Sequence, residues 1–228
     1  MLEYNSDERL FVCGATGEGK SELVRRVAEG VLAAGGRMVV SDPKESRPMR
    51  LFAPTLWRPG LFPAPGQAMR VVGRNREEID RMAAEAFRRG NCTALFDDIY
   101  LVSSPQKWPG HMMDIAVAGR ERGVGAIFNA QRPRNIPPWV TTEATVIVTF
   151  RLARQEDRDF LADNTQADNW EEAKDLAPHE WMVWRVGTRE AVRMAPLSIP
   201  DSPERSREDG AAAAGVHSKR RASRARNS

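Results

Sequence analysis

The feature that most constrains this chain is the segment GATGEGKS at residues 14–21, which spaces glycines, a lysine and a serine in a fixed pattern. It follows a compact apolar run at 9–13. It opens the segment 21–34, where apolar residues recur at helical spacing until Gly35 and Gly36 end the pattern. A glycine-rich loop between a buried strand and a helix turns backbone N–H groups into one concave site. The segment therefore predicts a phosphate-binding loop within an α/β fold.

Each residue type of this loop has a separate chemical task. Gly14, Gly17 and Gly19 let the backbone curl, and the helix that follows adds its N-terminal dipole. Lys20 brings a positive charge to the β- and γ-phosphates of ATP, and the Ser21 hydroxyl binds Mg²⁺. We expect ATP and Mg²⁺ as cofactors. The predicted nucleotide contacts are Gly14, Ala15, Thr16, Gly17, Glu18, Gly19, Lys20, Ser21 and Glu22.

Short apolar runs alternate with helical patterns along the rest of the chain. Strands are predicted at 37–41, 69–72, 93–96, 125–129 and 145–150, and helices at 77–89, 112–122, 156–163 and 170–176. This alternation predicts a mostly parallel sheet covered by helices on both faces. The runs at 181–186 and 191–194 predict a terminal β-hairpin. Five prolines between residues 46 and 68 predict an irregular excursion without a regular element.

Two adjacent acids, Asp97 and Asp98, follow the predicted strand at 93–96. A phosphate-binding loop of this kind needs an acid at a strand end to hold the magnesium shell through water. We expect Asp97 to fill this role together with Ser21, and Asp98 to act as, or help to place, the base that activates water. Ordinary turn chemistry is the alternative explanation for the pair.

A glutamine and several arginines complete the candidate site. The strand at 125–129 leads into Gln131, and ligands of α/β sheets bind beyond the carboxyl ends of strands. We therefore expect Gln131 to reach the γ-phosphate or the attacking water. Before this strand, Arg120 and Arg122 either complement a helix dipole or act on the ATP of a neighbouring copy as an arginine finger. Three further arginines fit the finger role equally well: Arg132, Arg134 and Arg151.

Charge is distributed unevenly along the 228 residues. The net charge is +3, and residues 201–228 alone hold seven Lys/Arg and four Asp/Glu with almost no large apolar residue. Such a segment buries too little surface to fold, so we predict an ATPase domain at 1–200 and a disordered basic tail at 201–228. The tail suits contact with nucleic acid or an acidic partner, or a solubilising role. No apolar run reaches 18 residues, so no membrane span is expected.

Taken together, these motifs resemble the FtsK/HerA superfamily of DNA-pumping ATPases, and within it the genome-packaging ATPases of tailless viruses with an internal membrane. The resemblance covers about residues 9–165. It rests on the loop, on VVSDPKE at 39–45, on FDD at 96–98, and on the segments 119–140 and 144–161. It implies a RecA-like (ASCE) P-loop NTPase core with Gln131 as the sensor glutamine. The chain departs from the family at Asp98, where related motors carry Glu.

The resemblance also implies a function. It predicts an ATP-hydrolysing translocase of double-stranded DNA that packages a viral genome into a preformed capsid. Such a motor acts as a homo-oligomeric ring, a pentamer or hexamer, in the host cytoplasm or at the packaging vertex of the virion, with a capsid vertex protein as a candidate partner. Its pore elements would grip DNA phosphates without regard to base sequence. The candidate pore elements are 46–68 and 99–110, the latter containing Lys107.

Other functions share the same motifs. A conjugation (plasmid-transfer) or filamentous-phage assembly ATPase of the same superfamily is the nearest alternative, although those proteins usually carry a membrane anchor. A non-catalytic assembly switch, in which ATP only sets the conformation because Asp98 fails as a base, is a second alternative. A small-molecule kinase shares the phosphate loop but leaves Gln131 unexplained.

Overall fold

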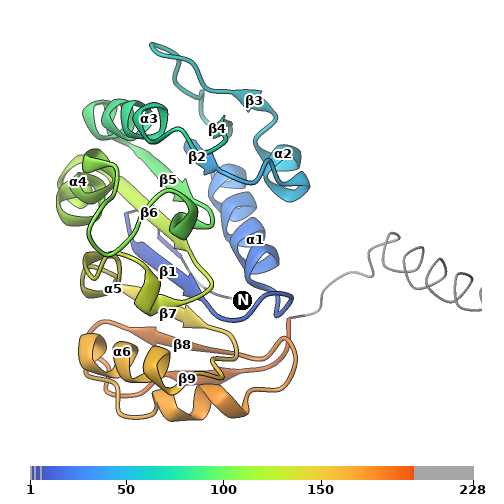
Figure 1. Cartoon of the computed structure of the whole chain (residues 1–228). Helices are drawn as coiled ribbons and strands as arrows, with labels where there is room; N and C mark the ends of the chain where they lie inside the picture. The colour runs from blue at the N-terminus through green and yellow to red at the C-terminus, as the bar shows by residue number, and fades with distance from the viewer. Residues whose placement is uncertain (1, 3, 6, 198–228) are drawn as a thin grey trace, which may run out of the picture. The chain divides into compact units, whose positions relative to one another are not determined.

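The structure is a computed structural model that describes residues 2, 4, 5 and 7–197. Within this range one sheet has the strand order β3-β4-β2-β5-β6-β1-β7-β8-β9 (Figure 1). Neighbouring strands are parallel from β3 to β7, whereas β8 pairs antiparallel with both β7 and β9. The predicted α/β class, with a mostly parallel sheet and a terminal hairpin, is confirmed.

The elements have the following bounds. The strands are β1 Arg9–Cys13, β2 Met38–Asp42, β3 Thr55–Leu56, β4 Ala68–Val72, β5 Cys92–Phe96, β6 Val124–Asn129, β7 Val146–Thr149, β8 Trp181–Arg185 and β9 Val192–Met194. The α-helices are α1 Lys20–Ala33, α2 Arg47–Phe52, α3 Arg76–Arg89, α4 Gly110–Ala118, α5 Trp139–Thr142 and α6 Gln155–Thr165. Short 3₁₀ helices are η1 Ile99–Leu101, η2 Gly119–Arg122, η3 Pro133–Asn135 and η4 Trp170–Asp175.

Alternate residues of the central strands enter two separate cores. On one face, Leu23 and Val27 of α1 pack with Leu10 of β1 in a buried apolar cluster. On the other face, α3, α4, α5 and α6 surround a second cluster that contains Phe11 and Phe128. Figure 1 shows α1 and α2 on one side of the sheet and α3, α4 and α5 on the other. The sheet is therefore covered on both faces, as the alternation of strands and helices predicts.

The parallel arrangement brings five strand ends to one edge of the sheet. Strands β2, β5, β6, β1 and β7 are neighbours in this order, and all of them run in the same direction. We call the edge at which they end the carboxyl edge, and the opposite one the amino edge. The segments that follow these strands meet at the carboxyl edge, where ligands of α/β sheets bind.

The segment 46–68 is more regular than its prolines predict, and the expectation of an irregular excursion is wrong. It contains α2, whose N-cap Ser46 accepts a hydrogen bond from the N–H of Met49 at 3.4 Å. Pro48 lies in the first turn of this helix, where its missing N–H costs nothing. Beyond α2, β3 extends the sheet, and the main-chain N–H of buried Trp57 donates to the carbonyl of Arg70 at 2.8 Å.

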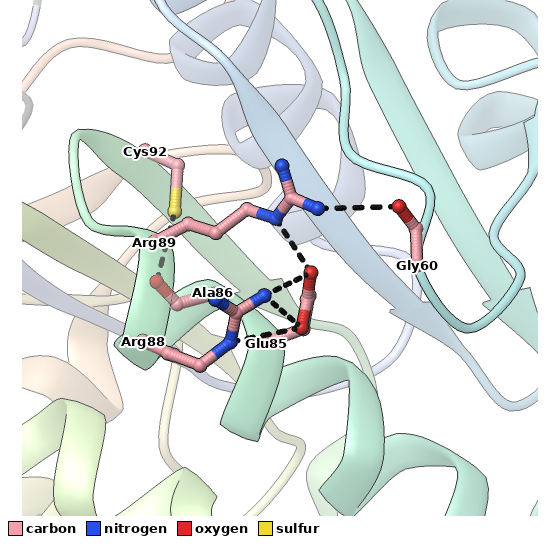
Figure 2. Close-up of polar contacts among 6 residues, drawn as sticks. All are labelled: Gly60, Glu85, Ala86, Arg88, Arg89 and Cys92. Carbon is pink, nitrogen blue, oxygen red and sulfur yellow. Dashed lines mark hydrogen bonds and ion pairs between the residues drawn. The ribbon is translucent and has the colours of Figure 1, made fainter.

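Arg89 of α3 anchors the far part of the same segment. Figure 2 shows its guanidinium group between the carboxylate of Glu85 and the carbonyl oxygen of Gly60, which accepts a hydrogen bond at 3.2 Å. The guanidinium carbon also lies 5.2 Å from the ring centroid of Phe62. Leu61, between these two anchor points, is 48% exposed. The loop between β3 and β4 is thus tied to α3 and presents an apolar side chain to solvent.

Two expectations concern the limits of the chain. The predicted disordered tail at 201–228 lies outside the described residues, so the domain boundary at residue 200 stays a prediction. Within the part of the chain that the structure covers, no helix has the length and apolar character needed to cross a membrane.

Candidate active site

The loop between β1 and α1 places its three glycines in conformations that other residues rarely adopt. Gly14, Gly17 and Gly19 have φ angles of 130°, 85° and 111°. Gly14 is also constrained by space, because a Cβ atom there would lie 2.7 Å from the Cβ of Phe150. The N–H of Gly14 donates to the carbonyl of Gln131 at 3.3 Å. The base of the loop is therefore tied to the segment that follows β6.

The next part of the loop is open for an anion. Residues 16–19 immediately precede the 14-residue helix α1, whose first N–H groups have no acceptor within the helix. Unpaired N–H groups at a helix N-terminus form a binding site for phosphate. Ser21, in the first turn of α1, is exposed. The predicted phosphate loop thus has the geometry to receive a nucleotide tail.

Lys20 is held in this loop rather than extended into solvent. It is 7% exposed, and its Nζ donates to the carbonyl of Ala15 at 2.8 Å. Burial lowers the pKa of Lys20, whereas the negative charges of Asp98 and Asp97 oppose that shift. The lysine therefore lies within electrostatic reach of both acids, as a shared phosphate site requires.

Two acidic residues near the loop have structural partners. Glu18 is buried, and its carboxylate accepts hydrogen bonds from Arg151 at 2.6 Å and from the N–H of His179 at 3.4 Å. The carboxylate of Glu22 pairs with Arg25 at 2.8 Å and with Arg26 at 2.7 Å. Both side chains stabilise the loop and its helix. We therefore expect Glu18 and Glu22 to contact a nucleotide through their main-chain groups and not through their carboxylates.

Asp97 is the more buried of the two acids that follow β5. Its side chain is packed at the carboxyl edge, where Oδ1 accepts a hydrogen bond from Nδ2 of Asn129 at 2.5 Å. Burial, reinforced by the charge of Asp98, raises the pKa of Asp97 to about 6. A buried carboxylate in this state gains from a nearby cation, since opposite charge offsets the cost of desolvation.

Asp98 adopts a left-handed backbone conformation, with φ 43° and ψ 49°. Its Oδ2 forms an ion pair with Nζ of Lys44 at 2.8 Å. Lys44 also lies over the ring of Tyr100, 5.6 Å from the centroid, and the Tyr100 hydroxyl accepts a hydrogen bond from Nε2 of Gln131 at 3.1 Å. Asp98 and Gln131 are therefore brought to the same site and are linked through Lys44 and Tyr100.

Three residues of this site were not among the sequence-based candidates: Lys44, Tyr100 and Asn129. Lys44 and Asn129 nevertheless carry a signal, because each lies at or just after the end of a parallel strand. The rule that ligands bind at strand carboxyl ends applies to them as it does to Gln131. Tyr100 carries no comparable signal, since a tyrosine in a short 3₁₀ turn is ordinary in any loop.

The structure does not bring Arg120 and Arg122 to this site. Both lie in η2, before β6, and therefore at the amino edge of the sheet. Arg120 lies 3.7 Å from Asp7, and the guanidinium of Arg122 lies 4.6 Å from the ring centroid of Phe87. They can act as fingers only on a nucleotide that is bound to a neighbouring copy.

The three other candidate arginines have local partners. Arg132 pairs with buried Asp157 of α6 at 2.9 Å, and so fixes the segment that carries Gln131. Arg134 lies 3.6 Å from Glu156 on the surface. Arg151 pairs with Glu18 of its own phosphate loop, as described above. These contacts favour positioning roles over a finger role in the chain as it stands.

The donor set fits Mg²⁺. This ion prefers oxygen ligands, retains several waters, and binds through one or two protein groups together with nucleotide phosphates. Ser21 offers an exposed hydroxyl, and Asp97 offers a buried carboxylate with a raised pKa. The described residues contain no group of three or more His, Cys, Asp or Glu side chains that could hold a metal, so at this site a metal would also need oxygen atoms of the nucleotide and of water.

Comparison with known proteins gives a result for the fold only. No protein-family model and no curated protein sequence matches this chain. Among solved structures, it is similar to the genome packaging NTPase of Sulfolobus turreted icosahedral virus 2 in complex with ATP-gammaS. The TM-score is 0.74 and the identity 18%, with coverage of 85% of this chain and 100% of the other.

Two further neighbours extend the comparison beyond viruses. The pCW3 conjugation coupling protein TcpA has a TM-score of 0.61 and 13% identity, covering 85% of this chain and 61% of the other. VirB4 of Thermoanaerobacter pseudethanolicus has a TM-score of 0.57 and 10% identity, covering 87% of this chain and 92% of the other. The resemblance inferred from the motifs is thus confirmed at the level of the fold.

Proposed function

We propose that this protein is an ATPase that uses Mg²⁺ and ATP to translocate double-stranded DNA, and that it packages a viral genome into a preformed capsid. One observation carries the enzymatic part of this proposal. The phosphate loop, the acids Asp97 and Asp98, and Gln131 come from separate parts of the chain and meet at the carboxyl edge of one sheet. If these residues had only separate structural roles, there would be no reason for all of them to lie at one edge of the sheet.

In the proposed reaction each group has one task. The loop amides and Lys20 bind the β- and γ-phosphates. Ser21 and Asp97 would hold the metal ion, which would neutralise charge that develops on the phosphates. Asp98 accepts the proton of the attacking water, and Gln131 orients that water in line with the bond between the γ-phosphorus and the bridging oxygen. The water oxygen bonds to the γ-phosphorus as that bond breaks, and ADP and phosphate leave.

The DNA part of the proposal rests on the structural neighbours and on the surface of this chain. One neighbour is a genome packaging NTPase and another a conjugation coupling protein. In the candidate pore segment 46–68, Arg50 and Arg58 are exposed, and Lys107 is exposed in the second candidate segment, 99–110. Cations of this kind bind DNA phosphates irrespective of base sequence. The protein would then work in the host cytoplasm or at the packaging vertex.

The proposed assembly is a homo-oligomeric ring, a pentamer or hexamer, with a capsid vertex protein as a further partner. The position of Arg120 and Arg122 at the amino edge supports a role across a subunit interface, because they are remote from the loop of their own chain. Mixing wild-type subunits with Arg120→Ala or Arg122→Ala subunits tests this. A finger in trans makes activity fall more steeply than the mutant fraction, whereas a linear fall would contradict it.

The experiment for the whole proposal compares ATP hydrolysis with and without duplex DNA over a range of salt concentrations. We expect DNA to stimulate hydrolysis, and Lys20→Ala or removal of Mg²⁺ by EDTA to abolish it. Lys174→Ala serves as a matched control, because this exposed lysine pairs with exposed Glu171 and takes no part in the proposed site. Hydrolysis that is indifferent to DNA at every salt concentration would contradict a DNA motor.

Two alternatives have specific support. The similarity to the conjugation coupling protein favours a plasmid-transfer or phage-assembly ATPase with the same core chemistry. The presence of Asp98, where related motors carry Glu, favours a non-catalytic ATP-dependent switch. Phosphate release in a single turnover separates the switch, which releases none, from both kinds of motor.

A further inference from the structure

We propose that Lys44 is a positioning residue for ATP hydrolysis, which holds Asp98 and, through Tyr100, Gln131 in one array. This inference rests on the proposed function, since it gives Asp98 and Gln131 their roles toward the attacking water. It assigns a task to the segment Asp42-Pro43-Lys44, which follows β2 and which the mechanism above leaves unused.

The turn that presents Lys44 is built around a buried carboxylate. Asp42 is fully buried, and its Oδ1 accepts a hydrogen bond from the N–H of Ser46 at 2.9 Å. Its carbonyl oxygen accepts hydrogen bonds from the N–H groups of Glu45 at 3.3 Å and Gly73 at 3.1 Å. Pro43 further restricts the backbone of this turn. Lys44 therefore leaves the sheet from a fixed point at the carboxyl edge.

The neighbouring strand brings Asp98 to the same point. Strands β2 and β5 are paired in parallel, and the N–H of Asp97 donates to the carbonyl of Ser41 at 3.1 Å. The residues after each strand are thus side by side. Lys44 Nζ reaches Asp98 Oδ2 at 2.8 Å, and the Asp98 side chain is only 11% exposed. With Oδ2 engaged, Oδ1 of Asp98 is the oxygen left to accept a proton from water.

The array continues to the glutamine. The Lys44 ammonium group lies over the ring of Tyr100, whose hydroxyl accepts the hydrogen bond from Gln131. Burial alone would lower the pKa of Lys44, but its interactions with Asp98 and Tyr100 outweigh that effect and raise it. The main-chain carbonyl of Gln131 in turn accepts the N–H of Gly14. The array is therefore joined to the phosphate loop by a main-chain hydrogen bond.

The consequence is a division of labour within the site. Lys20 belongs to the loop and binds phosphate, whereas Lys44 acts on the base and on the residue that orients water. Loss of Lys44 leaves Asp98 free to rotate about its side-chain bonds. A misplacement of a catalytic group by about 1 Å costs roughly 100-fold in rate. We expect the effect to fall on kcat rather than on nucleotide binding.

The test uses Lys44→Met, which keeps the length of the side chain and removes its charge. We expect kcat to fall roughly 10- to 100-fold, with KM and the Kd of a nonhydrolysable ATP analogue changed less than about threefold. Lys44→Arg should restore most of the rate, and Lys174→Met should match wild type. An unchanged kcat in Lys44→Met, or failure of Lys44→Arg to rescue, would overturn the proposal. A tenfold loss of affinity for the ATP analogue but not for ADP would overturn it too, because Lys44 would then bind the γ-phosphate.

A second readout needs neither nucleotide nor activity. In the ligand-free protein, the side-chain amide resonance of Gln131 in a ¹H–¹⁵N spectrum should shift in Tyr100→Phe, which removes only the hydroxyl, and also in Lys44→Met. The control Lys174→Met should leave it in place. A Gln131 signal that ignores Lys44→Met would show that the array is not connected, whatever the enzyme does. If wild type hydrolyses ATP no faster than Lys20→Ala while the expected amide shifts are observed, the proposed function is refuted and the connection between Lys44 and Gln131 is not.

Discussion

Replacement of Asp97 by Asn should stabilise the ligand-free fold while it destroys the proposed metal site. Asp97 is buried, and its pKa is raised from an ordinary value of 3.8 to about 6. A shift of this size corresponds to roughly 3 kcal/mol against the ionised form in the folded state. The amide of Asp97→Asn carries no charge, and its oxygen accepts the same hydrogen bond from Asn129. The variant therefore removes the electrostatic cost and keeps the contact.

The gain has a definite pH dependence. Below about pH 4 the carboxyl group is protonated in both the folded and the unfolded chain, so Asp97 costs nothing there. As the pH rises from 4 to above 6, the Asp97 carboxyl group ionises more readily in the unfolded chain than in the folded chain. The free energy of unfolding of wild type therefore falls over this range. Urea unfolding with EDTA and without nucleotide should show Asp97→Asn more stable than wild type by up to about 3 kcal/mol at pH 7.5. The two proteins should converge near pH 4.

Asp98→Asn provides the matched control. This change removes the ion pair with Lys44, whose side chain is 40% exposed, at a cost within about 1 kcal/mol. It also removes the charge that reinforces the raised pKa of Asp97, so any gain that grows with pH should be clearly smaller than that of Asp97→Asn, because burial is the larger cause. The burial argument is refuted if Asp97→Asn is less stable than wild type at pH 7.5, or if its advantage does not shrink at lower pH. Magnesium-dependent ATP hydrolysis should be absent from Asp97→Asn under all of these conditions.

Two further predictions concern stability. Gly14→Ala should cost about 3 kcal/mol, because it adds a steric clash to an unfavourable φ, whereas Gly17→Ala, with open space around it, should cost about 1 kcal/mol in thermal unfolding. Similar losses of stability in the two variants would contradict a steric clash at Gly14. Arg132→Ala should cost about 3 kcal/mol because it leaves buried Asp157 without its ionic partner, and exposed Arg134→Ala less than about 0.5 kcal/mol. Equal effects on the urea midpoint would argue against the buried pair.

The long elements were predictable because each carries a local pattern. The helix expected at 77–89 is α3 Arg76–Arg89, and the strand expected at 93–96 is β5 Cys92–Phe96. Apolar runs and helical spacing mark such elements without knowledge of the fold. Short elements carry less pattern. Helix α2 has one fully buried residue, Met49, and α5 spans four residues, so neither shows a periodicity that outweighs nearby prolines.

The site was predictable where a motif or a strand end marked it, and not where it depends on strand order. The loop, the acids and Gln131 follow apolar strands, so sequence alone suggests a common edge. That Lys44 meets Asp98 depends on the pairing of β2 with β5, which no local pattern contains. The same edge argument, applied to Arg120 and Arg122, places them at the amino edge, because they precede a strand rather than follow one.

The left-handed backbone at residue 98 has a consequence for any replacement of Asp98 by glutamate. Aspartate and asparagine adopt positive φ more often than other residues with a side chain, and glutamate does so less often, as Glu45 does in this chain at φ 54°. Glutamate at position 98 would therefore be a residue less suited than aspartate to the left-handed conformation of the main chain there. A longer acid at this position would change the energy of the main chain as well as the reach of the carboxylate.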